Sequence, residues 1–274
     1  MLFFEELAPL IPVYNLLFFI LGVPFVLWLN NKTRSDLICV VLGIAYMFLY
    51  GIVIQPAWDD WLFFFFGLVV GYITDYWGVK SKKWKYHPWD PDFGYSGYVG
   101  FAWGMVCMFT YSIGKGTPAS VETLFLPGVL FLIPTVILEW RYGETRRDQY
   151  FLFARAIFTF LAFLAANDLG LLFMAFFVGS YIEWAGVIGI KNWLYIDTMS
   201  FLFLSGGYSL LILTAKMIVD VIAVNPIGPF VLIFYILAAS FYAIDIFWAQ
   251  KKVVDKYELD KSDKAATAAR DFQQ

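Results

Sequence analysis

Long runs of apolar residues alternate with short polar segments along most of the chain. Three of these runs, residues 16–29, 62–73 and 171–182, contain no charged side chain. A helix needs about 20 apolar residues to cross the hydrocarbon core of a membrane, and nine segments meet or approach that length. They are residues 10–29, 36–55, 60–79, 94–114, 121–140, 150–166, 169–190, 199–222 and 227–249. The pattern predicts an all-α membrane protein with about nine transmembrane helices.

The composition supports lipid as the solvent of most of the chain. Of its 274 residues, 61% are hydrophobic and 15% are charged, against about 45–50% and about 25% in soluble domains. A globular core of this size cannot bury such a surplus. We expect one transmembrane domain over residues 1–250, with no soluble catalytic domain beside it, followed by a charged cytoplasmic tail over residues 251–274.

The positions of the cationic residues predict an orientation, because cytoplasmic loops collect Lys and Arg. With nine helices and the amino terminus outside, all but three of the 19 Lys and Arg residues fall in inner loops or in the tail. The exceptions are Lys115 in an outer loop, and Arg155 and Lys216 within helices. We therefore expect the amino terminus outside the cell and the carboxyl terminus in the cytoplasm.

Several kinds of site are excluded by the residue counts. A net charge of −3 argues against nucleic-acid binding. Cys39 and Cys107 both lie in apolar runs, and His87 is the single histidine. This set favours neither a disulfide framework nor a zinc, multi-histidine or haem site. We expect no metal and no cofactor.

The chain contains a faint internal repeat. Residues 69–79 align with 177–187, and the aligned pairs are Val70/Val178, Gly71/Gly179, Asp75/Glu183, Gly78/Gly186 and Val79/Val187. With a shift of one residue, Trp84 and Tyr86 align with Trp193 and Tyr195. The third and seventh predicted helices would cross the membrane in the same direction. We expect two parallel four-helix repeats, about 36–140 and 150–250, with the first helix as an addition.

Asp75 and Glu183 fall inside predicted membrane helices, where an unpaired charge costs roughly 2.5–3.5 kcal/mol at the bilayer centre. In one interpretation Arg155 pairs with Glu183 or Asp245, with Glu139 nearer the surface, and the charges only hold helices together. In the other, a carboxyl group without an ionic partner stays protonated and acts as an acid. Both interpretations remain open at this stage.

Aromatic residues make up 21% of the chain, more than two interfacial belts require. Their π-faces stabilise cations, so an acid beside aromatic rings suits carbocation chemistry on an unsaturated lipid. Rings in 63–66 and 173–177, together with Trp103, are candidates for the lining of an apolar cavity. The alternative is that most of them pack against other helices or face lipid.

The segment from Asp75 to Tyr86, followed by His87-Pro88 and Gly94, resembles the membrane-embedded lycopene cyclase domain of bacteria, archaea and fungi. In that family an Asp that closes a helix is followed nine positions later by a Trp-x-Tyr or similar aromatic pair. The resemblance implies parallel repeats, a carotenoid or terpenoid substrate and a bacterial or archaeal cell membrane. The chain departs from the family at Gly94–Gly100, which lacks the acidic Pro-x-Glu-Glu motif.

The leading hypothesis is an integral membrane enzyme that modifies an isoprenoid or carotenoid-type lipid by acid-initiated cyclisation or hydration. Asp75 and Glu183 are its candidate catalytic residues. The candidate substrate-binding residues are Trp77, Trp84, Tyr86, Trp184, Trp193 and Tyr195. One alternative is a non-catalytic lipid- or pigment-binding subunit of a membrane complex. Another is a proton-coupled carrier, disfavoured because paired Gly- or Pro-interrupted short helices are not evident.

Overall fold

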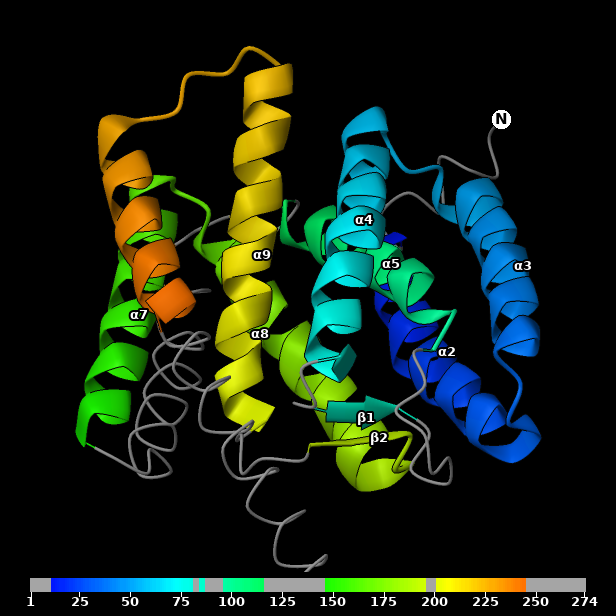
Figure 1. Cartoon of the computed structure of the whole chain (residues 1–274). Helices are drawn as coiled ribbons and strands as arrows, with labels where there is room; N and C mark the ends of the chain where they lie inside the picture. The colour runs from blue at the N-terminus through cyan, green and yellow to red at the C-terminus, as the bar shows by residue number, and fades with distance from the viewer. Residues whose placement is uncertain (1–10, 81–83, 87–95, 116–145, 196–200, 245–274) are drawn as a thin grey trace, which may run out of the picture.

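The computed structural model describes residues 11–80, 84–86, 96–115, 146–195 and 201–244, and these ranges are almost entirely helical (Figure 1). The all-α expectation is confirmed, apart from two three-residue strands. The elements of the first half are α2 (Ile11–Thr33), α3 (Asp36–Ile54), α4 (Trp58–Lys80), β1 (Trp84–Tyr86) and α5 (Val99–Gly114). Those of the second half are α7 (Arg146–Ala165), α8 (Leu169–Glu183), its π-helical continuation η3 (Trp184–Gly189), β2 (Trp193–Tyr195), α9 (Phe201–Ile222) and the helix Pro229–Ile244.

Local sequence signals set the ends of the first helices. Ser35 caps α3, since its side chain accepts a hydrogen bond from the backbone N–H of Ile38. The α3 helix ends at Ile54, and the next residue, Gln55, has a left-handed φ of 51° and precedes a proline. The α4 helix carries acidic residues in its first turn and Lys80 in its last, a charge order that complements the helix dipole.

Four of the described helices are long and apolar enough to cross a membrane, which indicates an integral membrane protein. They are α2 from Leu16 onward, α3, α4, and α8 with the start of η3. Large apolar side chains on their outer surfaces are exposed, among them Leu21 on α2 and Leu37 and Phe48 on α3. Such surfaces suit contact with lipid rather than water.

The centre of the molecule is formed by α4, α5, α8 and α9 (Figure 1). Inside the structure, 61% of the membrane-length window of α8 is buried, against 22% of that of α3. The α4 and α8 helices both descend toward the strand pair in Figure 1, whereas α9 rises away from it. α8 is therefore a central helix, and α3 lies at the periphery.

The two strands join segments that are far apart in the sequence. β1 pairs with β2 in antiparallel orientation, with Trp84 opposite Tyr195, Lys85 opposite Leu194 and Tyr86 opposite Trp193. Side chains two positions apart share a face of a strand, so Trp84 and Tyr86 point to the same side. Both Trp-x-Tyr segments lie in connections between predicted helices. Pairing with a distant segment supplies the backbone partners that neither segment finds locally.

Ion pairs gather at the end of the bundle away from the strands. Lys115, which follows α5, lies 3.1 Å from Asp59 and 2.8 Å from Asp60 at the start of α4. Lys216 of α9 lies 2.5 Å from Asp220 and 3.5 Å from Asp168, which precedes α8. In both cases a lysine on or just after an ascending helix lies near an acid at or just before the start of a descending one.

The predicted segments 94–114 and 150–166 correspond to shorter or shifted helices. α5 begins at Val99 and has 16 residues, and α7 begins at Arg146. The predicted segment 121–140 and the predicted tail 251–274 lie outside the described residues.

Candidate functional site

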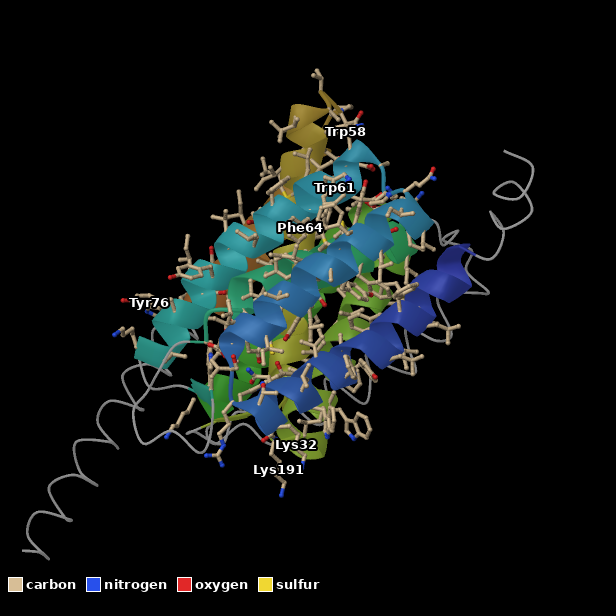
Figure 2. All side chains as sticks on the ribbon, turned by 90° about the vertical axis from the view of Figure 1, so that its right-hand side faces the viewer. Lys32, Trp58, Trp61, Phe64, Tyr76 and Lys191 are labelled. Atoms are coloured by element: carbon tan, nitrogen blue, oxygen red, sulfur yellow. The ribbon has the colours of Figure 1, made fainter. Side chains whose placement is uncertain are left out.

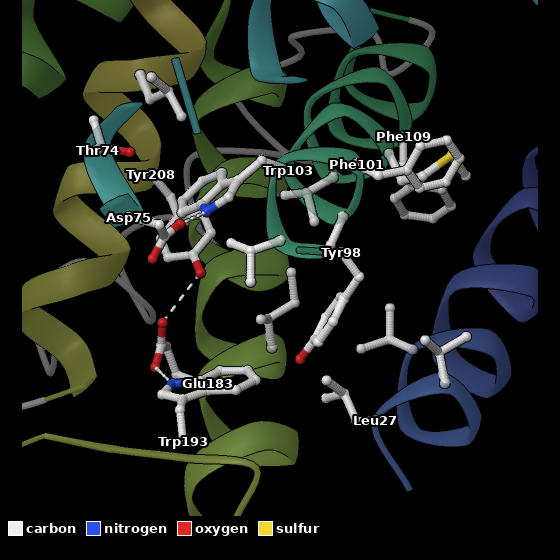
Figure 3. A pocket seen from close by; sticks show the side chains of 18 of the residues that line it. Leu27, Thr74, Asp75, Tyr98, Phe101, Trp103, Phe109, Glu183, Trp193 and Tyr208 are labelled. Carbon is white, nitrogen blue, oxygen red and sulfur yellow. Dashed lines mark hydrogen bonds between the residues drawn. The ribbon is translucent and has the colours of Figure 1, made fainter. Parts of the chain in front are cut away.

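A cavity of about 350 Å³ lies among the central helices, and Asp75 and Glu183 both line it (Figure 3). Its walls come from α2, α3, α4, α5, α8, α9 and the helix Pro229–Ile244, with side chains of β1 and β2 added. Most of the lining is apolar or aromatic. The volume falls within the range of about 300–1,000 Å³ found for small-molecule sites.

Asp75 lies near the end of α4 and is 3% exposed. Its Oδ1 atom accepts hydrogen bonds from Trp84 Nε1 at 3.0 Å and from the Tyr86 hydroxyl at 2.6 Å. Its Oδ2 atom accepts one from Trp103 Nε1 on α5. An indole N–H can only donate, so the two tryptophans hold the carboxyl group by both of its oxygens.

Glu183 occupies the matching place at the end of α8 and is also 3% exposed. Trp193 of β2 donates from Nε1 to its Oε2 atom at 3.2 Å. The hydroxyl group of Tyr208 on α9 donates to its Oε1 atom at 3.1 Å. Both carboxyl groups are therefore held by one indole from a strand and one aromatic ring from an ascending helix.

Aromatic contacts join the surroundings of the two carboxyl groups. The rings of Trp103 and Tyr208 stack with centroids 4.6 Å apart and planes 26° from parallel. Across the strand pair, the rings of Tyr86 and Trp193 lie 6.0 Å apart, a cross-strand aromatic contact of the kind that stabilises sheets. Asp75 and Glu183 thus belong to one connected site.

Glycines lie where these aromatic rings approach the helix backbones. A Cβ atom on Gly78 would lie 2.0 Å from the Trp84 ring, and one on Gly186 would lie 1.9 Å from the Trp193 ring. One turn or more upstream, Gly71 and Gly179 leave room for Trp103 and Tyr208 in the same way. The glycines that align in the repeat are therefore positions where a ring approaches the helix backbone.

The predicted binding residues divide into three groups. Trp84, Tyr86 and Trp193 line the cavity. Trp77 and Trp184 are not among the lining side chains, and Trp184 is 54% exposed. Neighbours one or two positions apart on a helix face different sides, so these two rings cannot accompany Asp75 and Glu183 into the cavity. Tyr195 pairs with Trp84 through the backbone, and its side chain lies outside the described residues.

The predicted charge partners are only partly described. Arg155 of α7 is 1% exposed, and its guanidinium carbon lies 5.1 Å from the ring centroid of Tyr242, a residue that lines the cavity. Asp245, one of its two proposed partners, and Glu139 lie outside the described residues. The structure therefore brings Arg155 beside the cavity wall without testing its pairing with Asp245.

Of the aromatic groups considered for the lining, Trp103 reaches the cavity and the phenylalanines of 63–66 do not. Phe63, for example, stacks on Tyr111 at 3.8 Å in the apolar core. Tyr208 and Tyr98 also line the cavity, and neither was predicted from the sequence. Gly179 indicated Tyr208 only indirectly. A glycine in a helix indicates that another residue packs closely against it but does not identify that residue.

Within the described ranges, no cluster of three His, Cys, Asp or Glu side chains could hold a metal ion. Comparisons of the chain with protein-family models, curated proteins and solved structures found no match. What the cavity offers is two carboxyl groups, fixed by N–H and O–H donors, beside aromatic faces and an apolar interior.

Proposed function

We propose that this chain is an integral membrane enzyme that modifies an isoprenoid or carotenoid-type lipid by acid-initiated cyclisation or hydration. The observation that carries the proposal is that Asp75 and Glu183 line the same apolar, aromatic cavity. An apolar chain would gain free energy by leaving water or the bilayer surface for such a lining. The two carboxyl groups would be the reactive groups that it meets there.

The chemistry requires one proton donor and one proton acceptor. One carboxyl group transfers its proton to a carbon of a double bond, so that an O–H bond breaks and a C–H bond forms. The neighbouring carbon becomes cationic and is attacked by a second double bond, which closes a ring, or by water. Loss of a proton to the other carboxylate then restores a neutral product, with no oxidant or reductant consumed.

The aromatic walls would lower the energy of the cationic intermediate. Trp103, Tyr208 and Trp193 lie directly beside the carboxyl groups, and π-faces attract cations without reacting as bases. Preorganised groups of this kind stabilise charge that develops during a reaction more effectively than water does.

A non-catalytic lipid- or pigment-binding subunit of a membrane complex is the second candidate. It is favoured by the three protein donors on Asp75, since a buried carboxylate with a purely structural role also needs its oxygens satisfied. In that case the cavity would hold its ligand unchanged.

The proposal includes a finer architecture of nine spans in two parallel four-helix repeats, with the amino terminus outside. It is supported by the common direction of α4 and α8 and by the matched Gly, Trp and carboxyl positions. Lys32 and Lys191 lie at one end of the molecule and Trp58 and Trp61 at the other (Figure 2), as expected if the lysine end is cytoplasmic. The resemblance to the lycopene cyclase domain is a further reason for a bacterial or archaeal cell membrane.

The test uses two nearly isosteric variants, Asp75→Asn and Glu183→Gln, produced in cells that supply linear polyenes. We expect either variant to lose product by about 100-fold or more, the usual scale for removing a general acid or base, while still folding and retaining lipid. Product is measured by chromatography of the extracted lipids, and folding by the thermal transition in detergent. Tyr111→Phe, which removes a hydroxyl outside the cavity, serves as the matched control.

Two outcomes would contradict the enzyme. If the wild-type chain binds polyene and converts none of it, the subunit function replaces the enzyme. If both variants convert lipid at the wild-type rate, neither carboxyl group takes part in the reaction.

A further inference from the structure

Tyr98 brings a third polar group into the cavity, separate from the two carboxyl groups. It directly precedes α5, is 5% exposed and lines the cavity. In Figure 3 the hydroxyl oxygen of Tyr98 is directed toward the side where Trp193 and Leu27 lie. The proposed reaction makes no use of this hydroxyl.

Asn192 holds the Tyr98 hydroxyl in place. Its Nδ2 atom donates to the phenol oxygen at 2.5 Å, and Asn192 itself is fully buried. Asn192 is held in position by the turn before β2. There Lys191 has a φ of 58°, and the Asn192 backbone N–H donates to the carbonyl of Gly186 at 2.7 Å. The phenol group therefore has a defined position.

The Tyr98–Asn192 pair has spare hydrogen-bonding capacity. Since Tyr98 accepts from Asn192, its own O–H can still donate, and Asn192 Oδ1 has no partner within the described part of the chain. If the amide were turned by 180°, Tyr98 would donate to Asn192, and a phenol lone pair and an amide N–H would be spare instead. In either orientation at least one donor and one acceptor remain.

Buried polar groups with spare capacity cost free energy unless a ligand or water meets them. Leu27 lies on the side of the cavity toward which the phenol points (Figure 3), and within the described part of the chain the Tyr98 hydroxyl group has no hydrogen bond besides the one with Asn192. A ligand oxygen at this point would satisfy the phenol while the rest of the ligand stayed in the apolar part of the cavity.

We propose that Tyr98, positioned by Asn192, binds a hydroxyl group of the ligand, so that the ligand is an isoprenoid-type alcohol rather than a pure hydrocarbon. This inference rests on the proposed function, because it requires the cavity to hold an isoprenoid-type molecule. It adds a specificity-determining contact that anchors one end of the ligand and so fixes which of its double bonds faces the carboxyl groups.

The test compares farnesol with farnesene, an alcohol and a hydrocarbon of the same chain type. The full chain is purified in detergent, and the bound fraction of each ligand is measured by native mass spectrometry. We expect wild-type protein to prefer farnesol. We expect Tyr98→Phe to weaken farnesol binding about three- to tenfold, as for one lost hydrogen bond, and to change farnesene binding by less than about twofold.

Tyr111→Phe is the matched control, because it removes a hydroxyl from α5 that donates to Asp59 outside the cavity. It should change the binding of neither ligand. Equal binding of farnesol and farnesene, no effect of Tyr98→Phe, or an equal loss of both ligands in that variant would overturn this inference and leave lipid binding by the cavity intact. Failure of the wild-type chain to bind either ligand would overturn the proposed function as well.

Discussion

Single glycines set the position of the indole rings that hold the two carboxyl groups. Gly78 and Gly186 each lie in contact with a tryptophan ring from a strand, and those rings donate to Asp75 and Glu183. A methyl group at either position cannot be accommodated by a small movement, because the nearest ring atoms would lie at 2.0 and 1.9 Å. The size of one residue therefore controls the geometry of an acid on a neighbouring turn.

Gly186→Ala should displace the Trp193 ring and remove its hydrogen bond to Glu183. Overpacking of this kind costs typically about 1–3 kcal/mol, so we expect a lower thermal transition in detergent together with weaker retention of the lipid ligand. Retention is measured by extracting the purified protein and quantifying the lipid per mole of chain.

Gly51→Ala supplies the control for this experiment. Apart from its chain neighbours and the backbone of its own helix, a Cβ atom on Gly51 of α3 would meet no heavy atom within 4 Å. Alanine favours a helix over glycine by about 1 kcal/mol. This variant should be as stable as the wild type or more so. A Gly186→Ala protein with unchanged stability and ligand retention would contradict the proposed packing around Trp193.

At the scale of elements, the strand pair supplies three of the side chains that donate hydrogen bonds to the two carboxyl groups. Trp84 and Tyr86 reach Asp75 from one face of β1, and Trp193 reaches Glu183 from β2. Lys85 and Leu194 are opposite each other at the centre of the pair, and alternation turns Lys85 away from the face that Trp84 and Tyr86 share. The pair can therefore be probed at its centre without touching the carboxyl groups.

The double variant Lys85→Cys with Leu194→Cys should form an intramolecular disulfide under mild oxidation. Cβ atoms of directly opposed residues lie about 4.5–5.5 Å apart, close enough for a disulfide after a small adjustment. The cross-linked peptide is identified by mass spectrometry with and without reductant. Each single variant is a control, and native Cys39 and Cys107 are buried; no cross-link between 85 and 194 would contradict the pairing of β1 with β2.

The helices and the two acidic residues could be predicted from the sequence. The strands and most of the aromatic side chains that contact the carboxyl groups could not. Apolar run length is a local signal, so α3 and α4 could be placed to within a few residues. The repeat paired Asp75 with Glu183 because both copies keep the glycines around them. Trp103 and Tyr208 perform matching roles with different side chains, so no repeat could align them. A strand of three residues becomes recognisable only when its distant partner is known.

At the scale of the whole molecule, charged side chains lie at both ends of the bundle. Lys32 and Lys191 share one end (Figure 2), whereas Lys115 lies with Asp59 and Asp60 at the start of α4. Because α4 descends toward the strands, the strand pair lies toward the end where the lysines gather. If that end is cytoplasmic, the carboxyl groups lie in the inner half of the membrane.

Labelling with a membrane-impermeant maleimide would test this orientation in intact cells. If the lysine end is cytoplasmic, Lys115→Cys should react from outside and Lys191→Cys only after the membrane is opened, because both residues are exposed and lie at opposite ends of the bundle. The unsubstituted chain provides the background from its two buried cysteines. The reverse pattern would invert the topology, and equal labelling of both variants would contradict a chain that separates Lys115 from Lys191 across the bilayer.

The pairing of β1 with β2 also has a consequence for assembly. Each strand belongs to a different half of the chain, and each brings an indole to a carboxyl group of its own half. A half of the chain produced alone would expose its strand without a pairing partner. Its carboxyl group would lie beside an incomplete cavity wall. The halves should therefore unfold in one cooperative transition, and two complementary fragments made in the same cell should associate before either can retain a ligand.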